Sequence, residues 1–258
     1  MNRYRALAAL LCAAVLSSCD QNAVQEIAGP APGARVKFFN FGVNAPAVNF
    51  YAGDTKMTAI SSATTPPVES TLGVAYGSVG SGGFYSGIVP GQYTLSGKIS
   101  ATIDKDLIIS QVSATIVDGK NYSYYMSGFY NTVTKTVGGF VVEDPYVEAF
   151  DYSVAYVRFI HAISNANPMT LYATNTTTAV VVTVGAEVAY MGAGAFIAVP
   201  NGVYNLGTRY AGVGTNAISR TLVSFVAGRV YTIGARGDIT IVSTTATNRP
   251  FLDNTANR

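Results

Sequence analysis

One stretch of this 258-residue chain occurs twice without a gap, and this repeat constrains the fold more than any other feature. The stretch ARVKFFNFGVNAPAVNFYA begins at Ala34, and AYVRFIHAISNANPMTLYA begins at Ala155. A repeat of this length indicates tandem domains and not a short-period solenoid. Further landmarks recur in the same order: residues 80–84 match 192–196, 89–90 match 199–200, 93–95 match 204–206, and 119–122 match 228–231.

Each copy of the repeat has the pattern of short strands separated by turns. Residues 92–99 and 203–210 alternate between the two faces of a strand, and a period of two is typical of a half-buried strand. Hydrophobic residues make up 49% of the chain and charged residues 12%, which excludes a disordered polyelectrolyte. We therefore predict an all-β fold of two tandem sandwiches, immunoglobulin-like or transthyretin-like, with about seven short strands each.

The first residues have the pattern of a bacterial export signal. Arg3 and Arg5 precede an apolar run at residues 6–16, which is too short to span a bilayer. The run leads into a motif that resembles the lipobox of bacterial lipoproteins, made here of Leu16, Ser17, Ser18 and Cys19. This resemblance implies a lipoprotein signal peptide cleaved before Cys19 and a diacylglycerol on that cysteine. A further acyl chain, such as palmitate, is often added, and two chains give a stable membrane anchor.

Removal of the signal changes what the cysteines and charges can do. Cys12 leaves with the signal and Cys19 is acylated, so the mature domains have no thiol for a disulfide, a zinc site or a nucleophile. The formal charge of +2 becomes zero, because two arginines leave with the signal. No basic run indicates a nucleic-acid partner.

These observations predict six segments. The boundaries are a lipoprotein signal peptide at 1–18, a lipid-attached tether at 19–33, a first β-sandwich at 34–142, an acidic linker at 143–153, a second β-sandwich at 154–243 and a polar tail at 244–258.

The repeat resembles the bacterial family called domain of unknown function 4397 (DUF 4397). Its members open with an Ala-Arg-Val-Arg-Phe-like strand and a His-Ala pair, and later have a Pro-Gly-x-Tyr turn and a Gly-x-x-Tyr strand. Residues 35–38, 44–48, 90–93 and 119–122 carry this resemblance in the first copy, and 158–162, 171–172 and 228–232 carry it in the second. It implies an exported β-sandwich module, often found in cell-envelope proteins, and implies no reaction. The first copy departs at Asn40, where the family has its histidine.

His161, the chain's single histidine, is the first candidate for chemistry, as a ligand or a general base. The alternative is a polar residue at a strand end that bonds to the following loop. Asn40 occupies the same place in the first copy, and asparagine replaces histidine as a hydrogen-bond partner but not as a base. The pair favours the structural interpretation, and one histidine excludes the usual His-rich metal sites.

Two other patterns have weaker chemical interpretations. Asp104 and Asp106 offer paired carboxylates for a hydrolase or for calcium, but they lack the EF-hand pattern and a counterpart in the second copy, which favours a solvated turn. The glycine-rich residues 77–83 lack the Gly-Lys-Ser/Thr of a phosphate loop and the spacing of a nucleophile elbow.

Tyrosines are the remaining signal. Tyr122, Tyr124, Tyr125 and Tyr130 cluster in the first copy and would suit a flat platform for sugar rings or for another protein. Alternation places Tyr122 and Tyr124 on one face and Tyr125 on the other, so some of these rings are expected in the core.

The leading functional hypothesis is an exported, non-enzymatic protein, lipid-anchored to the bacterial cell envelope, with a structural or protein-interaction role. It needs no cofactor and no metal, and its partners are the membrane and an envelope protein or glycan. A glycan-binding module is the alternative, and a hydrolase that uses Asp104 and Asp106 is the weakest one.

Overall fold

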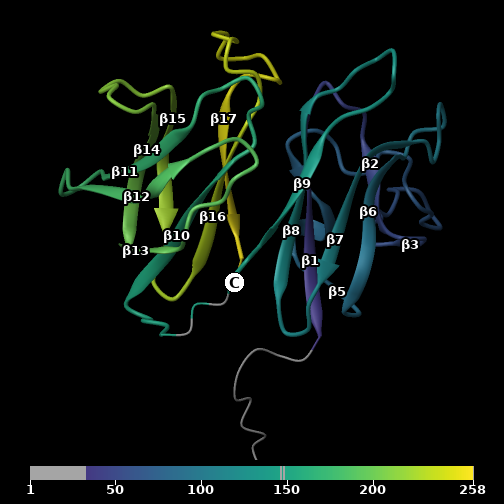
Figure 1. Cartoon of the computed structure of the whole chain (residues 1–258), viewed down its shortest axis with the longest axis horizontal. Coiled ribbons are helices and arrows are strands. Elements are labelled where there is room, and N and C mark those ends of the chain that lie inside the picture. Colours follow the sequence, from purple (N-terminus) through teal and green to yellow (C-terminus); the bar gives the residue numbers. More distant parts are fainter. Residues whose placement is uncertain (1–32, 146, 148, 258) are drawn as a thin grey trace, which may run out of the picture. The chain divides into compact units, whose positions relative to one another are not determined.

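The structure is a computed structural model that describes residues 33–145, 147 and 149–257. Strands account for nearly all regular structure in this part of the chain, and the other element is a short 3-10 turn, η2 (Gly80–Gly83). The expected all-β fold is therefore confirmed. The strands divide between two halves, which correspond to the two copies of the repeat (Figure 1).

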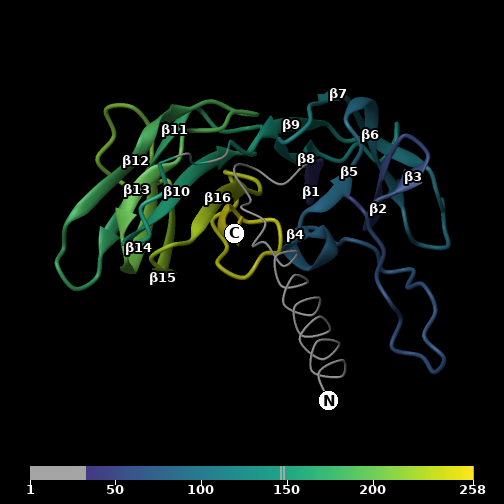
Figure 2. The same ribbon diagram turned by 90° about the horizontal axis from the view of Figure 1, so that it is seen from below.

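The first half is a sandwich of two sheets. One sheet has the order β4-β1-β8-β9, with β5 also paired to β1, and the other has the order β3-β2-β6-β7. The strands are β1 (Ala34–Val43), β2 (Val48–Ala52), β3 (Thr55–Lys56), β4 (Ser78–Val79), β5 (Ser86–Ile88), β6 (Gly91–Ile99), β7 (Ile108–Ile116), β8 (Asn121–Phe129) and β9 (Gly139–Glu143). The long connection between β3 and β4 extends away from the sheets (Figure 2).

The second half repeats this arrangement with the orders β13-β10-β16-β17 and β12-β11-β14-β15. Its strands are β10 (Val154–His161), β11 (Met169–Asn175), β12 (Val181–Val188), β13 (Ile197–Pro200), β14 (Gly202–Arg209), β15 (Ile218–Phe225), β16 (Val230–Arg236) and β17 (Phe251–Ala256). Thus β1, β8 and β9 correspond to β10, β16 and β17.

The opening strand of each half pairs in parallel with the next-to-last strand, β1 with β8 and β10 with β16, whereas every other strand pair is antiparallel. In a constant-type immunoglobulin sandwich the first strand lies in one sheet with the second. Here β1 and β2 belong to different sheets. The strand order therefore differs from that of the constant-type immunoglobulin sandwich.

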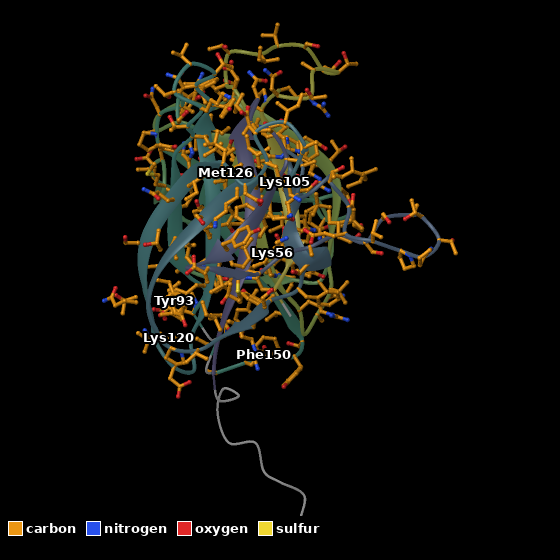
Figure 3. All side chains as sticks on the ribbon, turned by 90° about the vertical axis from the view of Figure 1, so that its right-hand side faces the viewer. Lys56, Tyr93, Lys105, Lys120, Met126 and Phe150 are labelled. Carbon is orange, nitrogen blue, oxygen red and sulfur yellow. The ribbon has the colours of Figure 1, made fainter. Side chains whose placement is uncertain are left out.

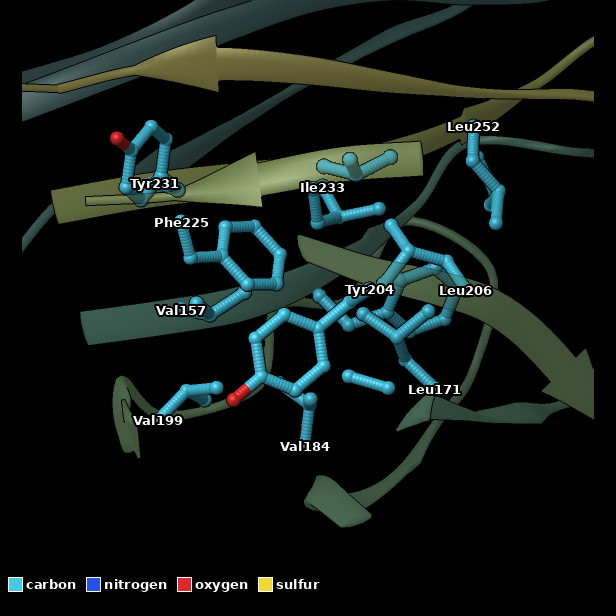
Figure 4. Packing of buried hydrophobic residues seen from close by; sticks show 14 of the residues in the cluster. Val157, Leu171, Val184, Val199, Tyr204, Leu206, Phe225, Tyr231, Ile233 and Leu252 are labelled. Carbon is cyan, nitrogen blue, oxygen red and sulfur yellow. The ribbon is translucent and has the colours of Figure 1, made fainter. Parts of the chain in front are cut away.

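Each sandwich has its own apolar core between its two sheets. In the second half, Tyr204, Phe225 and Tyr231 pack ring against ring, with centroids 5.4 and 5.3 Å apart, among aliphatic side chains (Figure 4). The first core is built around Phe38, Phe50 and Tyr124. Alternating strands such as β6 and β14 supply one face each, as their sequences predict.

A third apolar cluster joins the halves. It contains Phe39, Phe41, Tyr125 and Phe140 from the first half and Ile160 and Ala162 from the second. The sheets that contain β1 and β10 therefore pack against each other, and both strands are buried on their two faces. This explains why neighbouring apolar residues of these strands, Phe38 with Phe39 and Phe159 with Ile160, are both buried, one on each face of the strand.

Three sequence-based assignments are corrected by the structure. Residues 251–256 of the predicted polar tail form β17, whose Leu252 is fully buried, and Glu143 of the predicted linker ends β9. The matched segments 80–90 and 192–200 are also shifted by up to one residue. Val36 pairs with Ser86 and Val157 with Ile197, which makes Tyr85 and not Phe84 the counterpart of Phe196.

Candidate functional site

His161 is fully buried and bonded at both ring nitrogens. The backbone N–H of Ile163 donates to Nδ1 at 3.2 Å, so Nε2 carries the proton and donates to the carbonyl of Asn167 at 3.0 Å. Burial lowers the pKa of His161, although the bond to Asn167 opposes this shift. The ring therefore fastens the end of β10 to the loop that follows it.

Asn40 makes the equivalent bonds in β1, three residues before the end of that strand. Its Oδ1 accepts from the N–H of Gly42 at 3.3 Å, and its Nδ2 donates to the carbonyl of Pro46 at 3.2 Å. The partners lie two and six residues along the chain, as they do for His161. These bonds support the interpretation of His161 as a structural polar residue.

The clustered tyrosines are covered by the protein. Tyr122 and Tyr124 lie in the first core with 7% and 0% of their surface exposed, and Tyr125 stacks on Phe39 between the halves with ring centroids 4.4 Å apart. Tyr130 is partly buried against the same core. An exposed platform for a sugar needs rings that solvent reaches, and three of these four rings do not meet that condition.

Other tyrosines fasten turns, a role that the sequence analysis missed. The hydroxyl of Tyr93 donates to the carbonyl of Val89 at 2.9 Å, and that of Tyr204 donates to the carbonyl of Pro200 at 2.8 Å. Tyr122 and Tyr231 form a second matched pair, whose hydroxyl oxygens accept from the N–H groups of Val117 and Val226 at 3.2 and 3.1 Å. The signal was visible in the sequence as tyrosines at equal distances after the repeated turns.

Tyr93 and Lys120 lie toward one end of the first half, opposite Lys105 (Figure 3).

The remaining predicted residues do not assemble into a site. Asp104 and Asp106 lie in an exposed turn, and Asp104 pairs with Lys135 at 2.7 Å. Within the described ranges, no three His, Cys, Asp or Glu side chains are grouped closely enough to hold a metal ion. Leu16, Ser17, Ser18 and Cys19 lie outside the described residues. No helix in the described part of the chain is long and apolar enough to cross a membrane.

A cluster of buried charges lies between the halves, at Lys37, Arg158 and Asp144, which are 1%, 1% and 3% exposed. The Arg158 guanidinium donates to the Asp144 carboxylate and, at 2.9 Å, to the carbonyl of Glu143. Two hydroxyl groups, of Tyr85 and Ser123, donate to the same carboxylate at 2.6 Å. Asp144 falls in the predicted acidic linker, but it is buried and is the anion that compensates Arg158.

Lys37 has no carboxylate at hydrogen-bond distance among the residues described. Its ammonium donates to the carbonyl of Ala256 at 2.9 Å and lies 4.2 Å from the centroid of the Tyr85 ring. Burial lowers the pKa of Lys37 to about 8; the charge of Asp144 raises this pKa, and that of Arg158 lowers it further.

These contacts follow a pseudo-two-fold relation. Lys37 of β1 bonds to the last carbonyl of β17, and Arg158 of β10 bonds to the last carbonyl of β9. Each cation also lies over an aromatic ring of its own half, Tyr85 for Lys37 and Phe196 for Arg158. Such reciprocal contacts are typical of the isologous interface of a symmetric dimer, here contained in one chain.

A groove of about 390 Å³ opens beside this cluster, between η2 and the end of β17. Val79 and Phe84 form an apolar wall, and Arg229 supplies a guanidinium. Tyr85, Asn254, Ala256 and Asn257 complete the side next to Lys37.

Comparisons with models of known protein families and with curated protein sequences find no match. The resemblance of the repeat to the domain of unknown function 4397 family therefore rests on the motifs quoted above.

Proposed function

We propose that this protein is a non-enzymatic component of the bacterial cell envelope, held there by lipid on Cys19, and that its paired sandwiches serve as an interaction scaffold. The observation that carries the proposal is the sequence Leu16-Ser17-Ser18-Cys19 behind a short apolar run and two arginines. The resemblance of the repeat to an exported sandwich family supports the same location.

The packing of the sandwiches supports a scaffold role. The apolar cluster between the halves and the Arg158–Asp144 pair hold two domains together, so a partner meets one body instead of two independently moving modules. Such a body fits a protein whose task is to present surfaces at a fixed spacing.

Lipidation is tested by replacing Cys19 with alanine in cells. We expect the wild-type protein in the membrane fraction with the added mass of acyl chains, and the Cys19→Ala protein without that mass and outside that fraction. Cys12→Ala is the matched control, since it changes the other cysteine and leaves the motif intact. Unchanged membrane association of Cys19→Ala would refute the anchor. The interaction role is tested by cross-linking intact cells and identifying the proteins captured with the anchored chain.

A further inference from the structure

The two halves end differently at equivalent positions. Glu143 lies opposite Tyr122 in the first half, and Ala256 lies opposite the matched Tyr231 in the second. The next residues, Asp144 and Asn257, are therefore equivalent as well. Both donate their backbone N–H at 2.7 Å to the first residue of the neighbouring strand, Asp144 to the carbonyl of Asn121 and Asn257 to that of Val230. Two acidic residues in the first half thus correspond to two uncharged residues in the second.

The cations that surround these positions are kept in both halves. Lys120 pairs with Glu143 at 2.8 Å, whereas its counterpart Arg229 has no ion pair within the part of the chain described. Arg158 pairs with Asp144, whereas its counterpart Lys37 bonds to a main-chain carbonyl. Two cations at the end of β17 therefore lack the carboxylates that their counterparts have.

The groove between η2 and the end of β17 lies beside these two cations. Arg229, Ala256 and Asn257 line it, and Tyr85, whose ring lies against Lys37, forms part of its wall. No acidic side chain is among the lining residues. Behind the Tyr85 wall lie two buried cations, Lys37 and Arg158, and one buried acid, Asp144. With Arg229 in the lining, cations therefore outnumber acids around the groove, which attracts anions because the low-dielectric wall screens the field poorly.

The other groups of the groove suit a peptide. Phe84 is 76% exposed and stands with Val79 as an apolar wall. A ligand that matches both the unpaired guanidinium and this apolar wall has a carboxylate beside an apolar side chain, as an acidic peptide segment does. The groove's volume is within the usual range for a bound ligand.

We propose that this groove binds an acidic segment of a partner protein, with a carboxylate paired to Arg229, Lys37 attracting it from behind the wall, and an apolar side chain of the segment against Phe84. The planar guanidinium binds a carboxylate through two parallel hydrogen bonds. This inference rests on the proposed interaction role and names the chemistry of the partner.

The test uses the purified full chain with Cys19→Ala, so that binding is measured without the anchor. The probe is a fluorescent peptide Phe-Val-Val-Glu-Asp, which copies residues 140–144, and the control peptide is Phe-Val-Val-Gln-Asn. We expect the acidic peptide alone to bind, and Arg229→Gln to weaken binding about tenfold. Lys120→Gln is the matched control, because Lys120 occupies the same place in the first half, and it should leave affinity unchanged.

Three results would overturn the proposal. The first is equal binding of the two peptides, and the second is an equal effect of Lys120→Gln and Arg229→Gln. The third is equally tight binding of acetate or inorganic phosphate, which would mean an adventitious anion only. Asn257→Asp gives an independent measurement, because it supplies an internal carboxylate and should also weaken the acidic peptide. None of these binding measurements depends on the lipid anchor. A negative peptide-binding result therefore leaves the test of membrane association unaffected, and a negative result for membrane association leaves the peptide-binding test unaffected.

Discussion

His161 accepts one hydrogen bond from the backbone and donates another, so a replacement must provide both an acceptor and a donor. Asn40 shows that a carboxamide does this in the same fold. These two hydrogen bonds account for a histidine or an asparagine at this position. Its ring also lies 6.4 Å, centroid to centroid, from the ring of Tyr190, which covers the same end of β10.

At this position we expect His161→Asn to change the free energy of unfolding by less than about 1 kcal/mol and His161→Leu to lower it by about 2–4 kcal/mol. Leucine leaves the buried N–H of Ile163 without a partner, at about 1–3 kcal/mol, and removes the bond to the part-buried carbonyl of Asn167, at about 1 kcal/mol. Urea denaturation of both variants measures the difference. Equal stability of the two variants would contradict the hydrogen-bonding role.

His161 also predicts a pH effect. Burial lowers its pKa below the unfolded value of about 6.5, so the unfolded chain binds more protons than the folded chain in acid. The stability that His161 contributes is present above about pH 6.5 and is lost as pH falls toward the folded pKa. We expect His161→Asn to lose less stability than wild type between pH 7 and pH 5, as measured by thermal unfolding. Parallel curves would contradict the expectation.

At the scale of elements, alternation predicted β6 and β14 correctly, because each has one face on a core and the other toward solvent. It failed for β17, since Leu252 is the strand's one fully buried side chain and its neighbours Asp253 and Asn254 are polar. Asp253 is polar for a tertiary reason, its pair with Arg236 of β16. No local pattern in the sequence contains that information.

The buried charges between the halves, and the groove beside them, could not be predicted from the sequence for a related reason. The repeat aligned Lys37 with Arg158, but a cation in a strand is normally read as the solvent side of that strand. Their burial comes from the packing of one half on the other, which brings β9 to β10 and β17 to β1. Residues from both halves form the groove, and single-sequence periodicity carries no information about such contacts.

The assignment of β17 gives a test at this scale. We expect Leu252→Ala to lower the free energy of unfolding by about 2–5 kcal/mol, because it leaves a cavity in the second core. Val242→Ala is the control, since Val242 is 95% exposed and its truncation should stay within about 0.5 kcal/mol. Denaturation curves for both variants measure the two effects. If residues 251–256 were a polar tail instead of a packed strand, both substitutions would have equally small effects.

At the scale of the whole molecule, the interface between the halves contains a buried ion pair beside its apolar cluster. Asp144→Asn removes the carboxylate and leaves the Arg158 guanidinium uncompensated, which we expect to cost about 3–5 kcal/mol. Asp104→Asn removes an exposed partner of Lys135 and should cost less than about 1 kcal/mol. Thermal unfolding compares them, and similar losses would mean that the buried pair does not hold the halves together.

Lys37 should show its effect in alkaline solution. Its pKa falls from 10.5 to about 8, so between these values the unfolded chain binds more protons and stability rises with pH. The charged groups that act on it are Asp144 and Arg158, with Tyr85 against its ammonium. We expect wild type to gain stability relative to Lys37→Met from pH 8 to pH 10, as followed by urea denaturation. A constant difference between the two proteins would contradict the lowered pKa.

The parallel pairing of β1 with β8 has a mechanical consequence. Its register runs without interruption from Arg35 opposite Asn121 to Val43 opposite Phe129. A force that enters through residue 33 along the axis of β1 loads these hydrogen bonds together, in shear, instead of peeling them apart one at a time. Because β1 is also buried on both faces, sliding it out would tear two apolar layers at once. A chain anchored at its N-terminal end would therefore meet tension with a strand that is paired along its whole length and packed on both faces.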